Sequence, residues 1–260
     1  MHLSDQNKSC DKLEANPDYG KGIYRRRIRV ENQPGRVLAE MEDVTHAFRL
    51  ILEHDDCSVT AIEAKPIRYP FDTCPAAIAV LEPLVGCALG TDSLSFRNIL
   101  QPGQNCTHLY DLALLALAHS IRPVRLRVYD ISVPDECEDG ATIRLERDGV
   151  VVYEWRVKAH QVLEPAALAG KPMRQGFYNW ASEQFDGDSL ESALVLSRGY
   201  FVSQSRRHDY MHQDGRPAAQ DDMPEGSCYT YNTGVVERAI HTGGMARDFT
   251  ATAEQLLKFL

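Results

Sequence analysis

Residues 24–42 read YRRRIRVENQPGRVLAEME, and this stretch decides the fold. Apolar and basic residues alternate along residues 24–30, and this period of two is typical of a strand. Asn32-Gln33-Pro34-Gly35 is a turn signal, and residues 36–42 alternate again. The stretch predicts an antiparallel hairpin. Its run of Arg25, Arg27 and Arg29 favours a solvated strand face, and an anion-binding patch is the alternative.

Two further β-rich runs follow, at residues 44–54 and 58–69, and join near Asp55-Asp56. Four strands at such short spacing predict an antiparallel meander. Two helices should come next. The first spans about 75–85 and ends at Gly86, and the second spans 106–120 with Asn105 or Thr107 as its N-cap.

The second half of the chain returns to strands. Residues 124–129 alternate, and residues 141–147 and 150–159 should form a hairpin that turns at Asp148-Gly149. Helices are expected at 177–185 and at 252–260. A further helix should begin at Asp188, where Asp188-Ser-Leu-Glu191 has the pattern of a capping box. These elements predict an α+β fold: one or more antiparallel sheets, helices packed on one face and a C-terminal helical segment. We expect residues 1–22 to be a flexible N-terminus. Residues 23–260 should form a single domain with a polar loop near 204–226.

The composition limits the classes of partner. The 260 residues carry a formal net charge of −9, which argues against nucleic acid and anionic membranes. No apolar run is long enough to span a bilayer, and the N-terminus lacks a signal-peptide core. Seven cysteines without a Cys-x-x-Cys pair are typical of reduced thiols, so we expect a cytoplasmic protein. A homodimer is one oligomeric state that we expect for this protein.

The segment Asn105–Asp111 (NCTHLYD) opens an apolar stretch that runs to Ser120. On a helix, His108 and Asp111 are one turn apart, so the carboxylate can orient the imidazole as a general base. Cys106 at the helix start could have a lowered thiol pKa. Asn105, Cys106 and Tyr110 are therefore candidate substrate contacts. The structural alternative is that His108 caps the helix and Cys106 is a small core residue.

Two other groups are candidates. His46 begins an apolar strand face just after Asp43 and is either a core residue or a catalytic acid. Arg68, Tyr69 and Asp72 lie in a loop stiffened by prolines. There Arg68 could bind a carboxylate or phenolate and Tyr69 could move a proton, unless Arg68 merely pairs with Asp72. We predict no metal and no cofactor. A zinc site built from His46, Cys74, Cys106 and His108 is the alternative.

These segments together resemble a bacterial family known only as a domain of unknown function. The resemblance rests on Tyr24-x-Arg-x-Ile28, on Asp43 with His46, on Arg68-x-Pro70-x-x-x-Cys74 and on Gly103-x-x-Cys106-Thr-His108-Leu-x-Asp111. It covers roughly residues 24–160, and more weakly the tail with Cys228. The chain also resembles cofactor-independent, formaldehyde-releasing lyases that act on lignin-derived aromatic dimers.

The second resemblance implies a carbon–carbon lyase in aromatic catabolism with a small aromatic substrate. His108, oriented by Asp111, would be the base, Tyr69 or His46 the acid, and Arg68 the group that stabilises a phenolate. Two alternatives stay open. One is another acid–base or thiol hydrolase or isomerase of aromatic, steroid or acyl-thioester metabolites, and the other is a binding module without catalysis.

Overall fold

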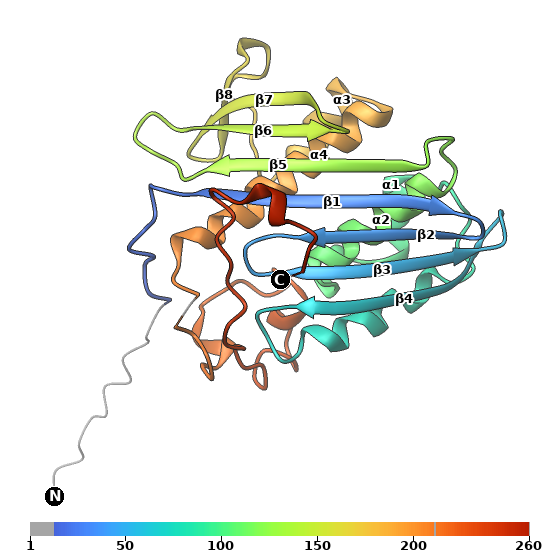
Figure 1. Ribbon diagram of the computed structural model, residues 1–260, viewed down its shortest axis with the longest axis horizontal. Helices are drawn as coiled ribbons and strands as arrows, with labels where there is room; N and C mark the ends of the chain where they lie inside the picture. The colour runs from blue at the N-terminus through green and yellow to red at the C-terminus, as the bar shows by residue number, and fades with distance from the viewer. Residues whose placement is uncertain (1–12, 211, 260) are drawn as a thin grey trace, which may run out of the picture.

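The computed structural model describes residues 13–210 and 212–259, which form an eight-stranded antiparallel sheet with helices against it (Figure 1). The strand order is β4-β3-β2-β1-β5-β6-β7-β8. The strands are β1 Ile23–Gln33, β2 Arg36–Glu42, β3 Ala47–His54, β4 Val59–Arg68, β5 Leu126–Pro134, β6 Ala141–Arg147, β7 Val150–Lys158 and β8 Gln161–Glu164. The predicted α+β class and antiparallel sheet are confirmed.

The sheet consists of two four-stranded meanders. Within β1–β4 and within β5–β8 each strand pairs with the next along the chain. The meanders join where β1 pairs with β5, with Ile28 opposite Tyr129. The predicted first meander is correct, whereas β8 and the joining pair were not predicted.

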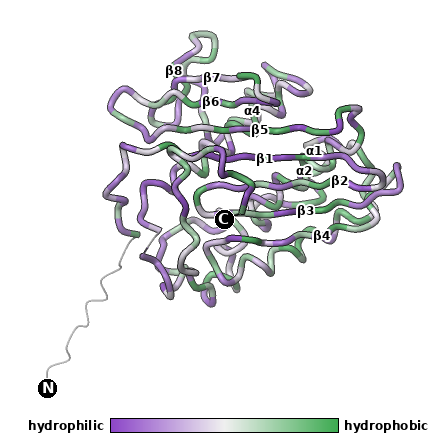
Figure 2. The backbone as a smooth tube through the Cα atoms, viewed as in Figure 1, coloured by the Kyte–Doolittle hydropathy of each residue, from purple (hydrophilic) through white to green (hydrophobic). Residues whose placement is uncertain are grey.

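Local turn chemistry explains the hairpins. Gly35 has a φ of 70°, and the pair Asp148 and Gly149 has φ values of 54° and 79°. Two successive left-handed residues form the tight turn that matches the twist of paired strands, and Asp-Gly is a favoured sequence for it. Hydrophobic and hydrophilic residues alternate along the strands in Figure 2, as the period of two requires.

The helices α1–α4 pack on one face of the sheet (Figure 1). The helical elements are η1 Cys74–Leu84, α1 Ser93–Ile99, η2 Pro102–Gln104, α2 Thr107–Ser120, η3 Ala166–Leu168, α3 Phe177–Gln184, α4 Gly187–Ser203, η4 Gln204–Arg207, η5 Ala218–Gln220, η6 Tyr229–Tyr231 and η7 Ala253–Gln255. The chain passes through η1, α1 and α2 between the two meanders and through α3 and α4 after the second.

Several helix predictions need correction. The helix expected at 75–85 is the 3-10 helix η1, because an apolar run does not distinguish the two helix types. The N-cap residue of α2 is Cys106, whereas Asn105 or Thr107 was predicted. α4 begins at Gly187 without a side-chain cap, and the carboxylate of Asp188 binds Arg127 at 2.9 Å instead. The final helix is only the short η7, since Leu257 has a left-handed φ of 66°. The helix α1 was not predicted.

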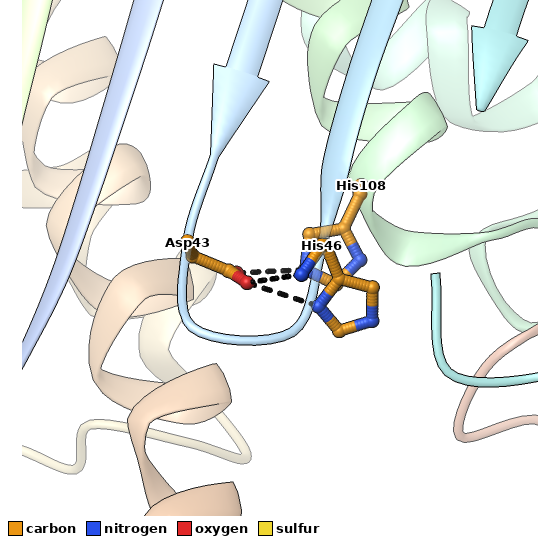
Figure 3. Close-up of side chains that lie close together, drawn as sticks. All are labelled: Asp43, His46 and His108. Carbon is orange, nitrogen blue, oxygen red and sulfur yellow. Dashed lines mark hydrogen bonds and ion pairs between the residues drawn. The ribbon is translucent and has the colours of Figure 1, made fainter. Parts of the chain in front are cut away.

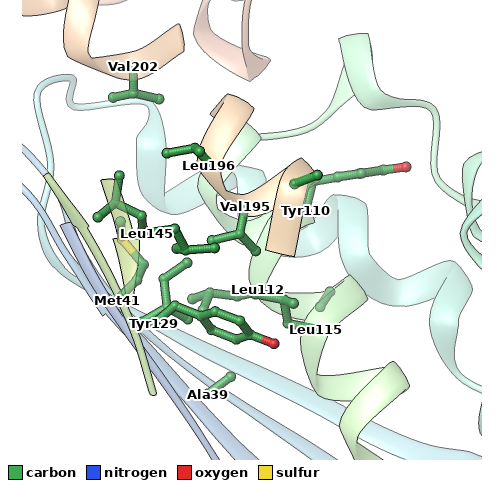
Figure 4. Packing of buried hydrophobic residues seen from close by; sticks show 14 of the residues in the cluster. Ala39, Met41, Tyr110, Leu112, Leu115, Tyr129, Leu145, Val195, Leu196 and Val202 are labelled. Carbon is green, nitrogen blue, oxygen red and sulfur yellow. The ribbon is translucent and has the colours of Figure 1, made fainter. Parts of the chain in front are cut away.

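One hydrophobic core fills the space between the sheet and the helices (Figure 4). Met41 and Tyr129 from the sheet pack with Leu112 of α2 and Leu196 of α4, and all four are almost fully buried. Almost every residue of α2 is buried, so this helix is a central element of the core rather than a surface helix.

The opposite face of the sheet is crossed by the C-terminal segment (red in Figure 1). The Leu257 amide donates to Glu42, and the Arg25 side chain donates to the Thr250 carbonyl. The arginines of β1 on this face are paired: Arg27 binds Asp130 at 2.6 Å and Arg29 binds Glu40. They therefore neutralise carboxylates of the sheet.

The described part of the N-terminal region is held against the rest of the chain. Ala15 forms a β-bridge with His208, and the Asn16 side chain donates to the Arg206 carbonyl at 2.8 Å. The predicted flexible N-terminus lies mostly outside the described residues, since residues 1–12 are not among them. Within the described ranges, no helix has both the length and the apolar composition needed to cross a bilayer.

Candidate functional site

A cavity of about 1350 Å³ lies between α2, α4 and the loops that precede α1 and α3. This volume exceeds the ~300–1000 Å³ of ordinary small-molecule pockets, so a molecule of two rings or more can enter. Most of its lining is apolar. Its apolar wall residues include Ile28, Leu114, Leu115, Leu194, Val195 and Phe201. Such a wall favours a largely apolar ligand, and the charged lining residues, which include five arginines, should orient it.

Arg26 is the unusual charged residue of this cavity. It lies on β1 between Tyr24 and Ile28, on the face covered by the helices, and is 1% exposed. None of its three guanidinium nitrogens has a hydrogen-bond acceptor among the described residues. The nearest carboxylate oxygen, Asp111 Oδ2, is 3.9 Å from Nη1, which is an ion pair but too long for a hydrogen bond.

Asp111 lies on α2 and also lines the cavity. Arg198 of α4 approaches its other oxygen, with Nε 3.4 Å from Oδ1. Burial nevertheless raises the pKa of Asp111, because desolvation of the carboxylate outweighs the attraction of Arg26 and Arg198. The carboxyl group therefore accepts a proton more readily than an exposed aspartate does.

A second polar cluster lies where β2 turns into β3. Asp43 holds two histidines: its Oδ1 is 3.1 Å from His46 Nδ1 and its Oδ2 is 3.3 Å from His108 Nε2 (Figure 3). The two imidazole rings stack with centroids 3.8 Å apart. The Tyr24 hydroxyl donates to Asp43 Oδ2 at 2.8 Å. The chain thus places a carboxylate, two imidazoles and a phenol in one buried group.

The protonation of this cluster follows from burial and charge. Desolvation, followed by the electrostatic effect of the neighbouring His46, lowers the pKa of His108 to about 3. The pKa of Asp43 lies well below its usual value because His46 and His108 outweigh the effect of burial. At neutral pH the cluster therefore contains an aspartate anion and an uncharged His108.

Arg26 connects the cluster to the cavity. Burial opposes its positive charge, but the nearby acidic groups, Asp111 and Asp43 among them, outweigh that effect and raise the pKa of Arg26. Tyr24, which binds Asp43, and Arg26, which lines the cavity, are alternate buried residues of β1, and we call the residues from the two histidines through Tyr24 and Arg26 to Asp111 the polar row.

The structure changes the pairing of the predicted site residues. His108 lies against Asp43 and His46, whereas its predicted partner Asp111 lies against Arg26 and Arg198. The two residues share a helix face, as expected, but each belongs to a different part of the polar row. In the described part of the chain, the potential metal donors around the two histidines are completed by Asp43. The alternative zinc site had Cys74 and Cys106 in this place.

Arg68 has a different position from the one that its predicted role requires. Its guanidinium donates to Glu42 Oε1 and to the carbonyls of Asp43, Val44 and Met245 at 2.6–2.9 Å. Arg68 is not among the described residues that line the cavity. Arg68 therefore fastens the β2–β3 turn to the C-terminal segment.

The other candidates divide between the two regions. Tyr110 lines the cavity, and burial raises the pKa of its hydroxyl to about 12. Cys106 is a buried core residue whose thiol pKa is raised to about 12 by desolvation, so the predicted lowering at the helix start is wrong. The side chain of Asn105 donates to the Gln101 carbonyl.

Tyr69 and Asp72 lie away from the cavity. Tyr69 is half-buried, and its carbonyl accepts a hydrogen bond from Thr242. Asp72 is exposed and accepts from the Ile240 amide, so it does not pair with Arg68. Both residues attach the C-terminal part of the chain to the loop after β4.

Sequence reasoning missed Arg26. The signal was present, because Arg26 occupies an apolar-face position of an alternating strand, where a charged residue needs a partner. Asp43 was noticed only as a neighbour of His46. The strand predicted at 44–54 begins only at Ala47, so His46 does not lie on a strand face but shares with Asp43 the turn between β2 and β3.

Residues 26–121 match a family described as "Protein of unknown function (DUF2889)". The match confirms the expected resemblance to a domain of unknown function over these residues, which include Arg26, Asp43, His46, His108 and Asp111. It brings no reaction with it. No curated protein matches the chain.

Proposed function

We propose that the cavity binds a largely apolar small molecule through an anionic oxygen and that Arg26 and Asp111 carry out acid–base chemistry on that molecule. The observation that carries this proposal is the buried Arg26 guanidinium, which has no hydrogen-bond acceptor among the described residues and belongs to a residue that lines a large, mostly apolar cavity. A carboxylate or phenolate in the cavity would supply the missing acceptor.

The energetics support an anionic ligand. A buried cation without hydrogen bonds costs several kcal/mol of desolvation, which a ligand oxygen can offset. Charge-assisted hydrogen bonds contribute about 1.5–3 kcal/mol each, and the guanidinium can form two at once. The nearby Asp111 supplies only an ion pair at 3.9 Å, so the hydrogen-bonding capacity of Arg26 is still available.

Asp111 is suited to proton transfer beside this anion site. Its raised pKa brings the carboxyl group closer to neutral pH, where a general base or acid is most effective. In this proposal Asp111 replaces His108 as the base, because Asp111 lines the cavity. Arg26 replaces Arg68 as the group that stabilises negative charge.

The particular reaction that we propose is formaldehyde release from a phenylcoumaran-type dimer. Asp111 removes the proton from the hydroxymethyl oxygen, and formaldehyde forms as the carbon–carbon bond to this group breaks. The released electron pair makes the stilbene double bond and expels the ring ether oxygen as a phenolate beside Arg26. Asp111 then returns its proton to the phenolate, so the reaction consumes no oxidant or reductant.

Two features support this choice within the wider class. The two reacting oxygens are separated by three carbon atoms, which suits a carboxylate and a guanidinium 3.9 Å apart. The cavity is large and mostly apolar, as a two-ring substrate requires. A thiol hydrolase is less well supported, because Cys106 is buried in the core with a raised thiol pKa.

The test combines ligand binding with turnover. Purified protein is titrated by calorimetry with a panel of aromatic carboxylates and phenols, and formaldehyde is assayed after incubation with phenylcoumaran-type dimers. Asp111→Asn should lower the rate at least about 100-fold, as loss of a general base does. Arg156→Leu is the matched control for Arg26→Leu, since Arg156 forms an exposed ion pair with Glu164 on β8.

The outcomes separate the two levels of the proposal. Binding without formaldehyde release from any such dimer would exclude the lyase reaction and keep the anion site. If no ligand in the panel binds more tightly than about 1 mM, or if Arg26→Leu leaves affinity unchanged, the anion site itself is excluded.

A further inference from the structure

We propose that Asp43, His46 and His108 bind one divalent transition-metal ion. The three donor atoms all lie within 4.8 Å of one another. Asp43 Oδ1 is 3.1 Å from His46 Nδ1, and Asp43 Oδ2 is 3.3 Å from His108 Nε2. Ligands of one metal ion at bonds of about 2.0–2.2 Å lie about 3.0–3.5 Å apart, so these separations fit a shared ion.

The donor set indicates the class of ion. Two imidazole nitrogens and one carboxylate oxygen suit Zn²⁺ or Fe²⁺ far better than Mg²⁺ or Ca²⁺, which prefer oxygen. Both rings direct a nitrogen toward Asp43 from the same side, as Figure 3 shows. Three protein ligands leave at least one coordination position for water or another ligand.

An orphaned nitrogen is the second, independent observation. His108 is 5% exposed, and its Nε2 has no hydrogen-bond partner within the described residues although it faces Asp43. A buried nitrogen without a partner costs free energy, and a metal ion would satisfy it. Asp43 alone does not, because the 3.3 Å separation lacks hydrogen-bond geometry.

The surroundings hold the donors in place. The backbone amides of Thr45 and His46 donate to Asp43 Oδ1 at 3.0 Å and 2.9 Å, and the Tyr24 hydroxyl donates to Oδ2. Arg68 binds the carbonyls of Asp43 and Val44 and so fixes the same turn. Such outer contacts orient the ligands in metal sites.

A purely structural role for Asp43 explains only part of this arrangement. As a turn residue, Asp43 would accept the amides of Thr45 and His46. That role accounts neither for the stacking of His108 on His46 nor for the unpartnered Nε2 of His108. The metal proposal accounts for the unpartnered Nε2.

The experiment measures metal binding without any assay of turnover. The 260-residue chain is stripped with a chelator and titrated with Zn²⁺ by calorimetry, and Co²⁺ is used in parallel for its visible absorption bands. We expect about one equivalent per chain. His46→Ala should weaken Zn²⁺ binding at least about 100-fold, since loss of a mere outer-contact residue already costs 10–100-fold.

The chain offers a matched control. His212 pairs with Asp209 at 2.7 Å on the surface, so His212→Ala removes a histidine beside a carboxylate outside the cluster. This variant should bind Zn²⁺ as the wild type does. His108→Ala is the second ligand variant, and circular dichroism shows whether each variant is folded.

Two results would overturn the inference. The first is no saturable Zn²⁺ or Co²⁺ binding by the folded wild type. The second is binding that folded His46→Ala and His108→Ala retain in full, which would show an adventitious site elsewhere. Titration of the metal-free and metal-loaded proteins with the organic panel then tests the cavity separately, so either proposal can fail alone.

Discussion

Arg26 and Arg68 are both buried, and both come from strands of the first meander, yet their surroundings are opposite. Arg68 makes four hydrogen bonds, one to Glu42 and three to backbone carbonyls. Arg26 is the more deeply buried of the two, and its guanidinium makes none within the described residues. Arg26 lines the cavity, whereas Arg68 joins a turn to the C-terminal segment.

The comparison shows that burial of a charge does not indicate its role, and that the acceptors around the charge do. A buried arginine whose donors are used by the protein is part of the structure, since its removal leaves a carboxylate and carbonyls unpaired. A buried arginine with unused donors beside a cavity has donors to offer a ligand, as we propose for Arg26. Four predictions test this difference, in order of decreasing effect.

Arg68→Leu should lower the free energy of unfolding by about 3–5 kcal/mol, because breaking a buried pair leaves one charge uncompensated. The charge left behind is Glu42, which is 1% exposed. Urea denaturation followed by circular dichroism measures the change. A loss below about 1 kcal/mol would mean that Arg68 contributes as little to the free energy of unfolding as we expect of Arg26.

Arg26→Leu should weaken binding of an anionic ligand at least about 100-fold, equivalent to about 2.7 kcal/mol. The free energy of unfolding should change by less than about 1 kcal/mol or increase, because the substitution removes a buried cation without hydrogen bonds and leaves Asp111 its ion pair with Arg198. Calorimetry with the best anionic ligand and urea denaturation of the same sample give both values. Severe unfolding with no change in affinity would reverse the assignments of the two arginines.

Arg26→Lys should retain the charge and lose the planar pair of donors, so affinity should fall about tenfold, less than in Arg26→Leu. The same calorimetric titration checks this ranking. Equal losses in both variants would show that the paired hydrogen bonds, rather than the charge, determine the affinity.

Asp111→Asn should alter how stability depends on pH. Burial raises the pKa of Asp111 in the folded state above its value of 3.8 in the unfolded chain. Its contribution is therefore fully present below pH 3.8 and is lost as the pH rises through the folded-state pKa. Relative to the variant, the wild type should lose stability from pH 4 upward, which urea denaturation across that range measures. A difference that grows in favour of the wild type would indicate a lowered pKa instead.

Much of the fold was predictable because its determinants are local. The alternation in β1 and the turns at Gly35 and Asp148-Gly149 specify hairpins from a few neighbouring residues. The pairing of β1 with β5 was not predictable in this way, because it joins segments about a hundred residues apart and carries no turn signal. The short strand β8 and the helix α1 also lack strong local patterns.

The candidate site was predictable only in part for the same reason. Helical spacing places His108 and Asp111 on one side of α2, but that spacing cannot show which side chains from the sheet meet them. His108 meets Asp43 from the end of β2, and Asp111 meets Arg26 from β1. The predicted dyad thus divides between two partners.

The amino-acid sequence by itself determined the first antiparallel meander, the hairpin of β6 and β7, the buried helix α2 and the presence of polar residues within its apolar stretch. These features depend on periodicity and turn chemistry, which act over a few residues. Only the tertiary structure decided that Arg26 keeps its donors free while Arg68 uses them. Hydrogen-bond acceptors come from distant segments, Glu42 and Met245 for Arg68, and their positions are fixed when the sheet, the helices and the C-terminal segment pack together.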